Sequence, residues 1–299
     1  MIPILDLRKL SAREPESMKT LHKAATDVGF FLVEGTTLSA ERVTEVIEAY
    51  RTFFKQPMSV KEAINMANSG ANRGWGAPAS EQVNPDANPD YKQVFDTGFD
   101  LPQDDPMAEL SVYAPNMWPD DPAFRAVVEG YYKEALIVAN QVLDAVIASV
   151  GLSPDRFQGA FEKPMALLRG NFYPERPDWA GAKDFGIAPH TDYGCLTLLA
   201  IDGLAGLEVL GRDGAWIPVK AQPGRFVVNF GEMLERWTSG LIVATEHRVV
   251  GSLQERISVP MFYNPSYDTN VAPDGQPPFT AGDHLTKRFE ETYLHLKAS

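Results

Sequence analysis

The N-terminal part of the chain alternates short apolar runs with amphipathic segments. The runs "IPILDL" and "VGFFLVEG" each predict a strand, and a helix is expected between them, around residues 16–28. A longer helix is predicted in "LSAERVTEVIEAYRTFFKQP", where Ser39 can cap the start and Pro57 marks the end. Its apolar residues recur at helical spacing, so this helix has one face suited to a core.

The sequence pattern changes twice in the middle of the chain. Residues 66–119 are rich in Gly, Pro, Asn and Asp, which predicts a long irregular segment. In a compact domain such a segment is usually functional or mobile. From Asp120 to about Val150, apolar residues again recur near every 3.6 positions, which predicts a long helix at the centre of the packing. We therefore divide this part into an N-terminal α/β region with an irregular substrate-side segment, residues 1–119, and a helical region, residues 120–164.

After residue 165 the apolar runs are short and are separated by Gly, Asp or Pro. Runs such as "ALLRGNFY", "CLTLLAI", "RFVVNF" and "RISVPMFYNP" predict many short strands, the pattern of a sandwich or jelly-roll barrel. We expect this catalytic core over 165–265 and a closing helix within 266–299. No clean linker divides the chain, so the prediction for 1–299 is one domain, mainly β with flanking helices, in which a jelly roll packs on a long spine helix.

Composition and charge narrow the function classes. The chain has 299 residues, 44% of them hydrophobic, and it contains no apolar run long enough to span a bilayer. Its start does not resemble a signal peptide, and its single Cys195, expected in the core, favours the reducing cytoplasm. A net charge of −13 argues against binding to nucleic acid or to an anionic membrane. No protein partner is implied.

The stretch "PHTDYGCLTLL" places an imidazole and a carboxylate two positions apart. On an extended strand His190 and Asp192 would project from the same face. His247, at the edge of a later short strand, could join them, because a jelly roll brings distant strands side by side. Two histidines and one carboxylate suit a ferrous ion with open positions, and catalytic zinc is the weaker alternative. By themselves, such histidines can also be ordinary strand-end residues.

Two further pairs of polar residues share the same spacing. Arg256 and Ser258 in "RISVPMFYNP" should face one way, and a buried guanidinium there needs an anionic partner, such as a ligand carboxylate or a structural acid. Asn171 and Tyr173 in "RGNFYP" should likewise share a face and could hydrogen-bond a small polar ligand.

Taken together, these segments resemble the isopenicillin N synthase-like family of iron(II)- and 2-oxoglutarate-dependent dioxygenases over nearly the whole chain. The shared motifs include "GFFLVEG", "DYKQVFDTG", "NFYP", "HTDYGCLTLL", "VVNFGEMLERWTSG", "EHRVV" and "RISVPMFYNP". One departure is Glu34-Gly35-Thr36, where many relatives have Asn-His-Gly, and it puts only the close subfamily in doubt.

The resemblance implies a double-stranded β-helix core and assigns roles to these residues. His190, Asp192 and His247 would be the iron ligands, Arg256 and Ser258 would hold the distal carboxylate of 2-oxoglutarate, and Tyr173 and Asn171 would contact this cosubstrate. With O2, such an enzyme oxidises a small-molecule substrate, most commonly by hydroxylation, and releases succinate and CO2. The residues expected to border the substrate are Arg73, Trp75, Tyr91, Phe95 and Phe262, and Arg73 favours an acidic substrate.

Two alternatives remain open from the sequence. An iron oxidase of the same fold that does not use 2-oxoglutarate, and that closes a ring or desaturates its substrate, could keep Arg256 and Ser258 for the substrate's own carboxylate. A jelly-roll binding module without redox chemistry is the other, although it gives no reason for three metal-ligating side chains in this arrangement.

Overall fold

The computed structural model describes residues 2–69, 71–251 and 253–293. Its helices and strands, in chain order, are β1 (Ile4–Asp6), α1 (Leu7–Ser11), α2 (Pro15–Lys23), η1 (Ala24–Val28), β2 (Phe30–Glu34), α3 (Ala40–Phe54), α4 (Met58–Glu62), η2 (Met66–Asn68), β3 (Gly74–Gly76), β4 (Gln93–Gly98), η3 (Pro106–Glu109), η4 (Ser111–Tyr113), α5 (Pro122–Ser149), η5 (Pro154–Phe157), β5 (Leu167–Tyr173), β6 (Ile187–His190), β7 (Leu196–Ile201), β8 (Leu207–Leu210), β9 (Trp216–Pro218), β10 (Phe226–Phe230), α6 (Glu232–Trp237), β11 (His247–Val249), β12 (Arg256–Tyr263) and α7 (Ala281–Thr292).

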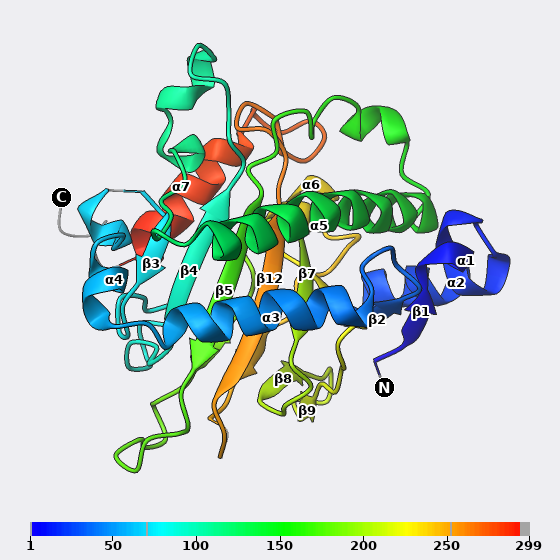
Figure 1. Ribbon diagram of the computed structural model, residues 1–299. Coiled ribbons are helices and arrows are strands. Elements are labelled where there is room, and N and C mark those ends of the chain that lie inside the picture. The colour runs from blue at the N-terminus through cyan, green and yellow to red at the C-terminus, as the bar shows by residue number, and fades with distance from the viewer. Residues whose placement is uncertain (1, 70, 252, 294–299) are drawn as a thin grey trace.

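Two sheets form the centre of the molecule. The larger sheet has the strand order β1-β2-β10-β7-β12-β5-β4-β3, and the smaller has the order β6-β11-β8-β9. Strands far apart in sequence are neighbours in both, as a jelly roll requires. The long helices α3 and α5 run across one face of the larger sheet (Figure 1). The fold is the expected double-stranded β-helix with flanking helices.

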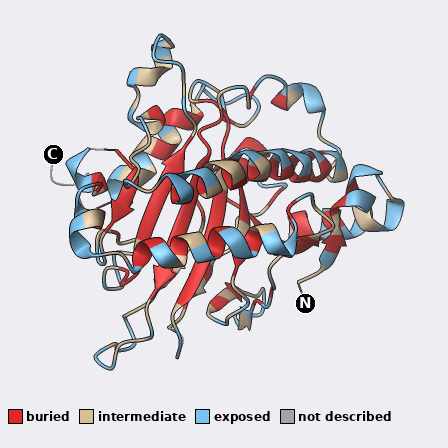
Figure 2. Ribbon diagram, in the orientation of Figure 1, coloured by how far each residue is buried: buried red, intermediate tan, exposed pale blue. Residues whose placement is uncertain are grey.

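The strands β5 and β12 separate a helix-covered face from a cavity-facing one. Residues of even number on β5 and odd number on β12, such as Leu168, Ile257 and Met261, are fully buried in the cluster that packs against α3 and α5. Their neighbours Asn171, Tyr173, Arg256 and Ser258 line a cavity on the other face. The period of two in these strands therefore places apolar side chains under the helices and polar ones toward the smaller sheet. Figure 2 shows the buried strands behind helices whose outer faces are exposed.

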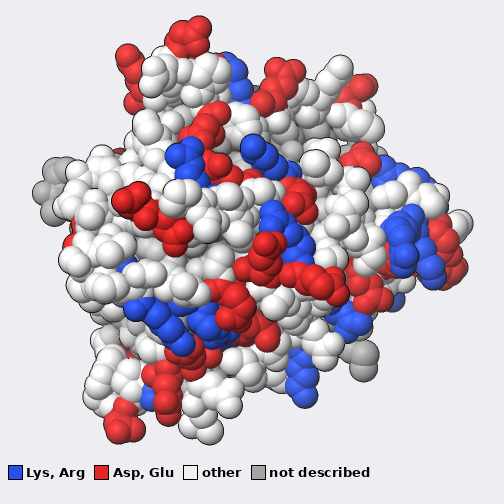
Figure 3. Space-filling view, viewed as in Figure 1, with Lys and Arg blue, Asp and Glu red and all other residues white. Residues whose placement is uncertain are grey.

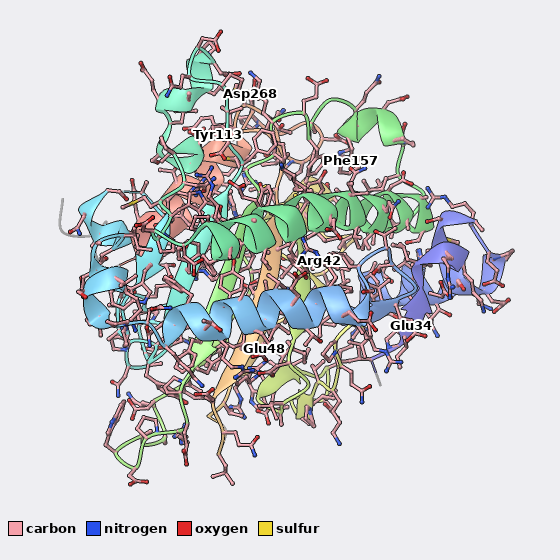
Figure 4. The ribbon with its side chains drawn as sticks, in the orientation of Figure 1. Glu34, Arg42, Glu48, Tyr113, Phe157 and Asp268 are labelled. Carbon is pink, nitrogen blue, oxygen red and sulfur yellow. The ribbon has the colours of Figure 1, made fainter. Side chains whose placement is uncertain are left out.

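The two long helices lie close to their predicted bounds, and the predicted cap at Ser39 is confirmed. Ser39 accepts a hydrogen bond from the backbone N–H of Arg42 at the start of α3, and Asp121 caps α5 ahead of Pro122. Arg42 points from α3 toward α5, where its Nε donates to Glu134 at 3.0 Å (Figure 4). The two helices are thus joined by a polar contact at their solvent side as well as by their apolar faces.

The structure confirms two expectations about the N-terminal half and corrects a third. The strand in "IPILDL" is short, with three residues, because Asp6 caps α1 directly after it. The helix expected at 16–28 ends as an α-helix at Lys23 and continues as a π-helical turn to Val28. Within 66–119, β3 and β4 extend the larger sheet, because β4 pairs with β5 along six residues. The strand "QVFDTG" was not predicted, because the residues around it are typical of turns.

The C-terminal helix α7 is confirmed to residue 292, whereas His295 and the rest of 294–299 lie outside the described residues. Acidic and basic side chains are interspersed on the face that carries α3 and α5 (Figure 3). Within the described ranges, no helix combines the length and the apolar character that a bilayer span requires.

Candidate active site

His190, Asp192 and His247 converge at the end of the smaller sheet. His190 and His247 are directly paired across β6 and β11. The Nε2 atoms of His190 and His247 lie 3.7 Å and 3.6 Å from Asp192 Oδ1. The ligand atoms of all three residues lie within 4.8 Å of one another, which fits one bound metal ion. Asp192 lies in the turn after β6 rather than on the strand itself, so the turn, and not strand alternation, brings its carboxylate to the histidines.

Backbone and side-chain hydrogen bonds orient these three groups. The Nδ1 atoms of His190 and His247 contact the carbonyl oxygens of Ala188 at 2.8 Å and Thr245 at 3.2 Å. A carbonyl only accepts, so each Nδ1 carries the proton and each Nε2 keeps its lone pair for a metal. Thr197 and Asn229 donate to Asp192 Oδ2, which leaves Oδ1 facing the two imidazoles. The chain thus presents two neutral nitrogens and one carboxylate oxygen to a common point.

The ionisation of the cluster supports metal binding. Burial, with the neighbouring His247, lowers the pKa of His190 below the usual value for an imidazole. Burial alone would raise the pKa of Asp192, but the two histidines, Thr197 and Asn229 outweigh it and hold that pKa below its usual value. A neutral imidazole at His190 and an ionised carboxylate at Asp192 are the forms that bind a cation.

A buried guanidinium without an acidic partner lies on the neighbouring sheet. Arg256 is only 1% exposed, and its Nε and Nη1 have no hydrogen-bond partner. No Asp or Glu among the described residues forms an ion pair with it, and its guanidinium carbon lies 5.0 Å from the centre of the Tyr173 ring. Because an unpaired buried charge is costly, this arrangement points to an anionic ligand that enters the cavity.

The groups around Arg256 complete a polar wall. Arg256 pairs with Tyr173, and Ser258 pairs with Asn171, across β12 and β5. Asn171 Nδ2 donates to Ser258 Oγ at 3.2 Å, while Asn171 Oδ1 is buried without a partner. Burial raises the pKa of Tyr173, which keeps its phenol protonated. All four side chains line one cavity of about 260 Å³ that also reaches the histidines.

The substrate-side residues expected from the sequence divide into two groups. Arg73 and Phe262 line the cavity. Trp75 instead packs in the core and donates from Nε1 to Gln93 at 3.0 Å, and Phe95 lies among Phe53 and Phe124. Tyr91 is buried with its ring edge-on to Trp179. These three side chains do not line the cavity, because their strands and loops turn them toward apolar neighbours.

A buried charge network in the wall of the cavity was not predicted. Glu81 accepts from Lys92 at 2.7 Å and from Arg169 at 3.0 Å, and Arg169 also bonds Asp96 with two nitrogens. Arg169 bonds the hydroxyl of Tyr293, which follows α7. Strand alternation could have identified Arg169, since it shares a face with Asn171 and Tyr173, but no sequence signal links it to Glu81.

The helix α7 covers one side of the cavity. Leu285, Phe289 and Thr292 line the cavity, and Arg288 contacts Glu232 of α6 at 3.1 Å. Glu232 also accepts a hydrogen bond from Thr191, which lies between two of the candidate ligands. Helix α7 is therefore joined, through Glu232, to the segment that carries two of the candidate ligands.

Comparisons with known proteins agree along the whole chain. Residues 2–121 match the family described as non-haem dioxygenase in morphine synthesis N-terminal, and residues 164–265 match the 2OG-Fe(II) oxygenase superfamily. The 2-oxoglutarate-dependent dioxygenase caaD of Aspergillus niger is 33% identical, over 98% of this chain and 94% of its own length.

Two solved structures with the same fold contain 2-oxoglutarate together with a second small molecule. A Neurospora crassa protein in complex with alpha-KG and thymine superposes with a TM-score of 0.84 at 25% identity, covering 97% of this chain and 96% of that one. JOX2 in complex with 2OG, Fe and JA has a TM-score of 0.79 at 29% identity, covering 99% of this chain and 88% of that one.

Proposed function

The chain belongs to the iron(II)- and 2-oxoglutarate-dependent oxygenases, and on this premise we propose that His190, Asp192 and His247 hold the iron while Arg256 and Ser258 hold the 2-oxoglutarate. As a member of this family the protein is an oxidoreductase, a dioxygenase that uses iron(II), 2-oxoglutarate and O2. The reaction proposed is hydroxylation of a small molecule, with release of succinate and CO2.

One observation supports the proposed roles above all others. Three metal-ligating atoms converge within 4.8 Å, and the same cavity contains a buried guanidinium with two unpartnered nitrogens. The donor set of two imidazoles and one carboxylate suits iron(II) and leaves other coordination positions free. The free nitrogens of Arg256 suit a carboxylate, which a planar guanidinium binds through charge-assisted hydrogen bonds.

Each side chain has a defined task in this proposal. When bound, the iron supplies the activation of oxygen that no protein side chain can supply. His190 and His247 present Nε2 as ligands, fixed by their Nδ1 hydrogen bonds to backbone carbonyls. Arg256 and Ser258 would receive the distal carboxylate of 2-oxoglutarate, and Tyr173 and Asn171 would orient the molecule by hydrogen bonding. Phe262 and the covering helix α7 would exclude water from the reacting groups.

The compartment proposed is the cytoplasm. Its support is the single cysteine, Cys195, which is a free buried thiol in the core, as a reducing environment permits.

Anaerobic titration of the iron(II)-loaded protein with 2-oxoglutarate tests the proposal. We expect a visible charge-transfer band that saturates with 2-oxoglutarate and is absent in Asp192→Ala. Under air, turnover should convert 2-oxoglutarate into succinate in proportion to the oxidised product. A folded, iron-loaded protein without the band, or a product formed without succinate, would instead favour an oxidase that does not use 2-oxoglutarate.

A further inference from the structure

The cavity contains a second buried guanidinium that lacks an acidic partner. Arg73 is 3% exposed and lines the same cavity as the candidate iron ligands. It donates to the carbonyl oxygens of Asn72 at 2.8 Å and Val112 at 2.6 Å, while its Nε has no partner. No carboxylate among the described residues forms an ion pair with it. Two neutral carbonyls supply no opposite charge, and the nearby acids Asp96 and Asp100 do not form an ion pair with it.

A glycine on the cavity-facing side of β4 makes room for this side chain. Gly98 is directly opposite Leu167 on β5, and Leu167 lines the cavity. A Cβ atom on Gly98 would overlap the guanidinium of Arg73 and would lie 2.7 Å from its Nε. Gly98 does not have a positive φ, so its backbone does not require glycine. The missing side chain instead allows the guanidinium to lie close to the backbone of β4.

The sheet register places Arg256 and Gly98, against which Arg73 lies, at different positions of the larger sheet. Thr197, Phe262, Leu167 and Gly98 are direct partners in a row across β7, β12, β5 and β4. Thr197, which donates to Asp192, and Gly98, against which Arg73 lies, are three strands apart, roughly 14 Å at the usual strand spacing. Arg256 lies on β12 at the opposite end of that strand from Phe262.

Apolar side chains line the same cavity as Arg73, among them Phe262, Leu167, Val112 and Met165, beside the charged side chains of Glu81 and Arg169. A ligand that fills this space would bury an apolar body and direct one polar end at Arg73. Burial lowers the pKa of Arg73 because its neighbouring acids do not fully offset the lost hydration, and a bound anion would reverse that effect.

We propose that Arg73 binds the carboxylate of the substrate, so that the oxygenase acts on an acid with an apolar body whose carboxylate lies at the Arg73 guanidinium and whose oxidised carbon lies at the iron. This inference rests on the proposed function, because it needs 2-oxoglutarate to occupy Arg256. Arg256 then binds the carboxylate of the cosubstrate, and Arg73 binds the carboxylate of the substrate.

A purely structural role for Arg73 makes a different prediction. Arg73 could serve only to hold the backbone at Val112, and a neutral hydrogen-bond donor would then replace it without changing the preference for anions. Arg73→Gln keeps a donor and removes the charge, whereas Arg73→Lys keeps the charge. Gly98→Ala leaves Arg73 in the sequence but fills the space in which its guanidinium lies.

The test measures binding to the anaerobic complex with iron(II) and saturating 2-oxoglutarate by calorimetry. The probes are octanoate, decanoate and phenylacetate, each compared with its own primary amide. We expect at least one carboxylate to bind wild type about tenfold or more tightly than its amide. Arg73→Gln should abolish that preference, Arg73→Lys should restore part of it, and amide binding should stay unchanged in both.

Two outcomes would overturn the inference: no preference for any carboxylate in wild type, or an undiminished preference in Arg73→Gln. Where thermal unfolding shows that Arg73→Gln is not folded, Gly98→Ala decides the matter, since an undiminished preference in that variant also contradicts it. Binding of 2-oxoglutarate is measured first in every variant. Its failure in wild type would refute the proposed function, whereas normal 2-oxoglutarate binding without a carboxylate preference refutes the Arg73 site alone.

Discussion

His190 and His247 are direct partners across β6 and β11, with their ring centroids 4.3 Å apart. Each ring is fixed by a hydrogen bond from Nδ1 to a backbone carbonyl two residues earlier in the chain. This pairing makes two imidazoles from distant parts of the sequence into one chelating unit, and Asp192 completes it from the adjacent turn.

Replacing His247 with alanine should abolish tight binding of iron(II). The variant loses one of three ligands, so we expect metal affinity to fall by about 100-fold or more, while the fold persists. Anaerobic equilibrium dialysis with iron(II) measures the change. His22→Ala is the matched control, because the His22 side chain on α2 hydrogen-bonds the carbonyl of Ser149 and is not part of the cluster, so this variant should bind iron like wild type. Unchanged affinity in His247→Ala would remove this residue from the ligand set.

Replacing Asn229 with alanine should weaken metal binding without removing a ligand. Asn229 Nδ2 donates to Asp192 Oδ2 at 2.6 Å and helps to aim Oδ1 at the histidines. Loss of such an orienting contact typically costs about 10- to 100-fold in metal affinity, so we expect about tenfold here, since the contact from Thr197 remains. The same dialysis measures it. An affinity equal to that of wild type would show that Thr197 alone orients the carboxylate.

Replacing Arg256 with methionine should stabilise the ligand-free protein and abolish its response to 2-oxoglutarate. The guanidinium is buried without an acidic partner, and an apolar side chain of similar length avoids that desolvation cost of about 1–4 kcal/mol. Thermal unfolding of the manganese-loaded protein, with and without 2-oxoglutarate, measures both effects.

Wild type should unfold at a higher temperature when 2-oxoglutarate is present, and Arg256→Met should not. Arg225→Met is the control, since Arg225 forms a half-exposed ion pair with Glu34 and should keep the response. A full 2-oxoglutarate response in Arg256→Met would contradict the proposed role.

The buried carboxylate of Glu81 should give the protein acid-sensitive stability. Burial raises its pKa, but Arg169 and Lys92 outweigh this and lower the pKa from 4.5 to about 2. A lowered pKa in the folded state stabilises the protein above pH 4.5, and this contribution is lost as the pH falls toward 2. We expect the difference in unfolding free energy between wild type and Glu81→Gln to shrink by about 3 kcal/mol over that range.

Urea denaturation at a series of pH values measures this difference. Asp90 provides a control of opposite sign, because burial raises its pKa from 3.8 to about 6. Its contribution is greatest below pH 3.8 and is lost as the pH rises through 6, so Asp90→Asn should remove a decline in stability between those values. A pH-independent difference for Glu81→Gln would show that Glu81 is not ionised in the folded protein.

The sequence predicted the ligand-bearing strands because their pattern is local. The period of two in "RISVPMFY" separates Arg256 and Ser258 from Ile257 and Val259, and the structure has them on opposite faces. The cap at Ser39 depends on adjacent residues and was likewise predicted from the sequence, whereas the cap at Asp121 was not predicted. Resemblance to the family then supplied the reaction class.

Other features depended on contacts with residues far away in the sequence, which no local pattern predicts. β4 forms a strand because its backbone pairs with β5, although Gly, Pro and Asn residues surround it in the sequence. The pairing of β4 with β5 directs Phe95 toward the aromatic side chains of the core. Arg73, which lies before β3, packs against Gly98 of β4. The ion pairs of Glu81 likewise join three separate segments.

The chain by itself therefore determined which side chains share a strand face, because alternation and capping are properties of neighbouring residues. The tertiary structure alone decided which of those faces meet, which guanidiniums lack an acidic partner and where a glycine leaves room, because these depend on contacts between residues far apart in sequence.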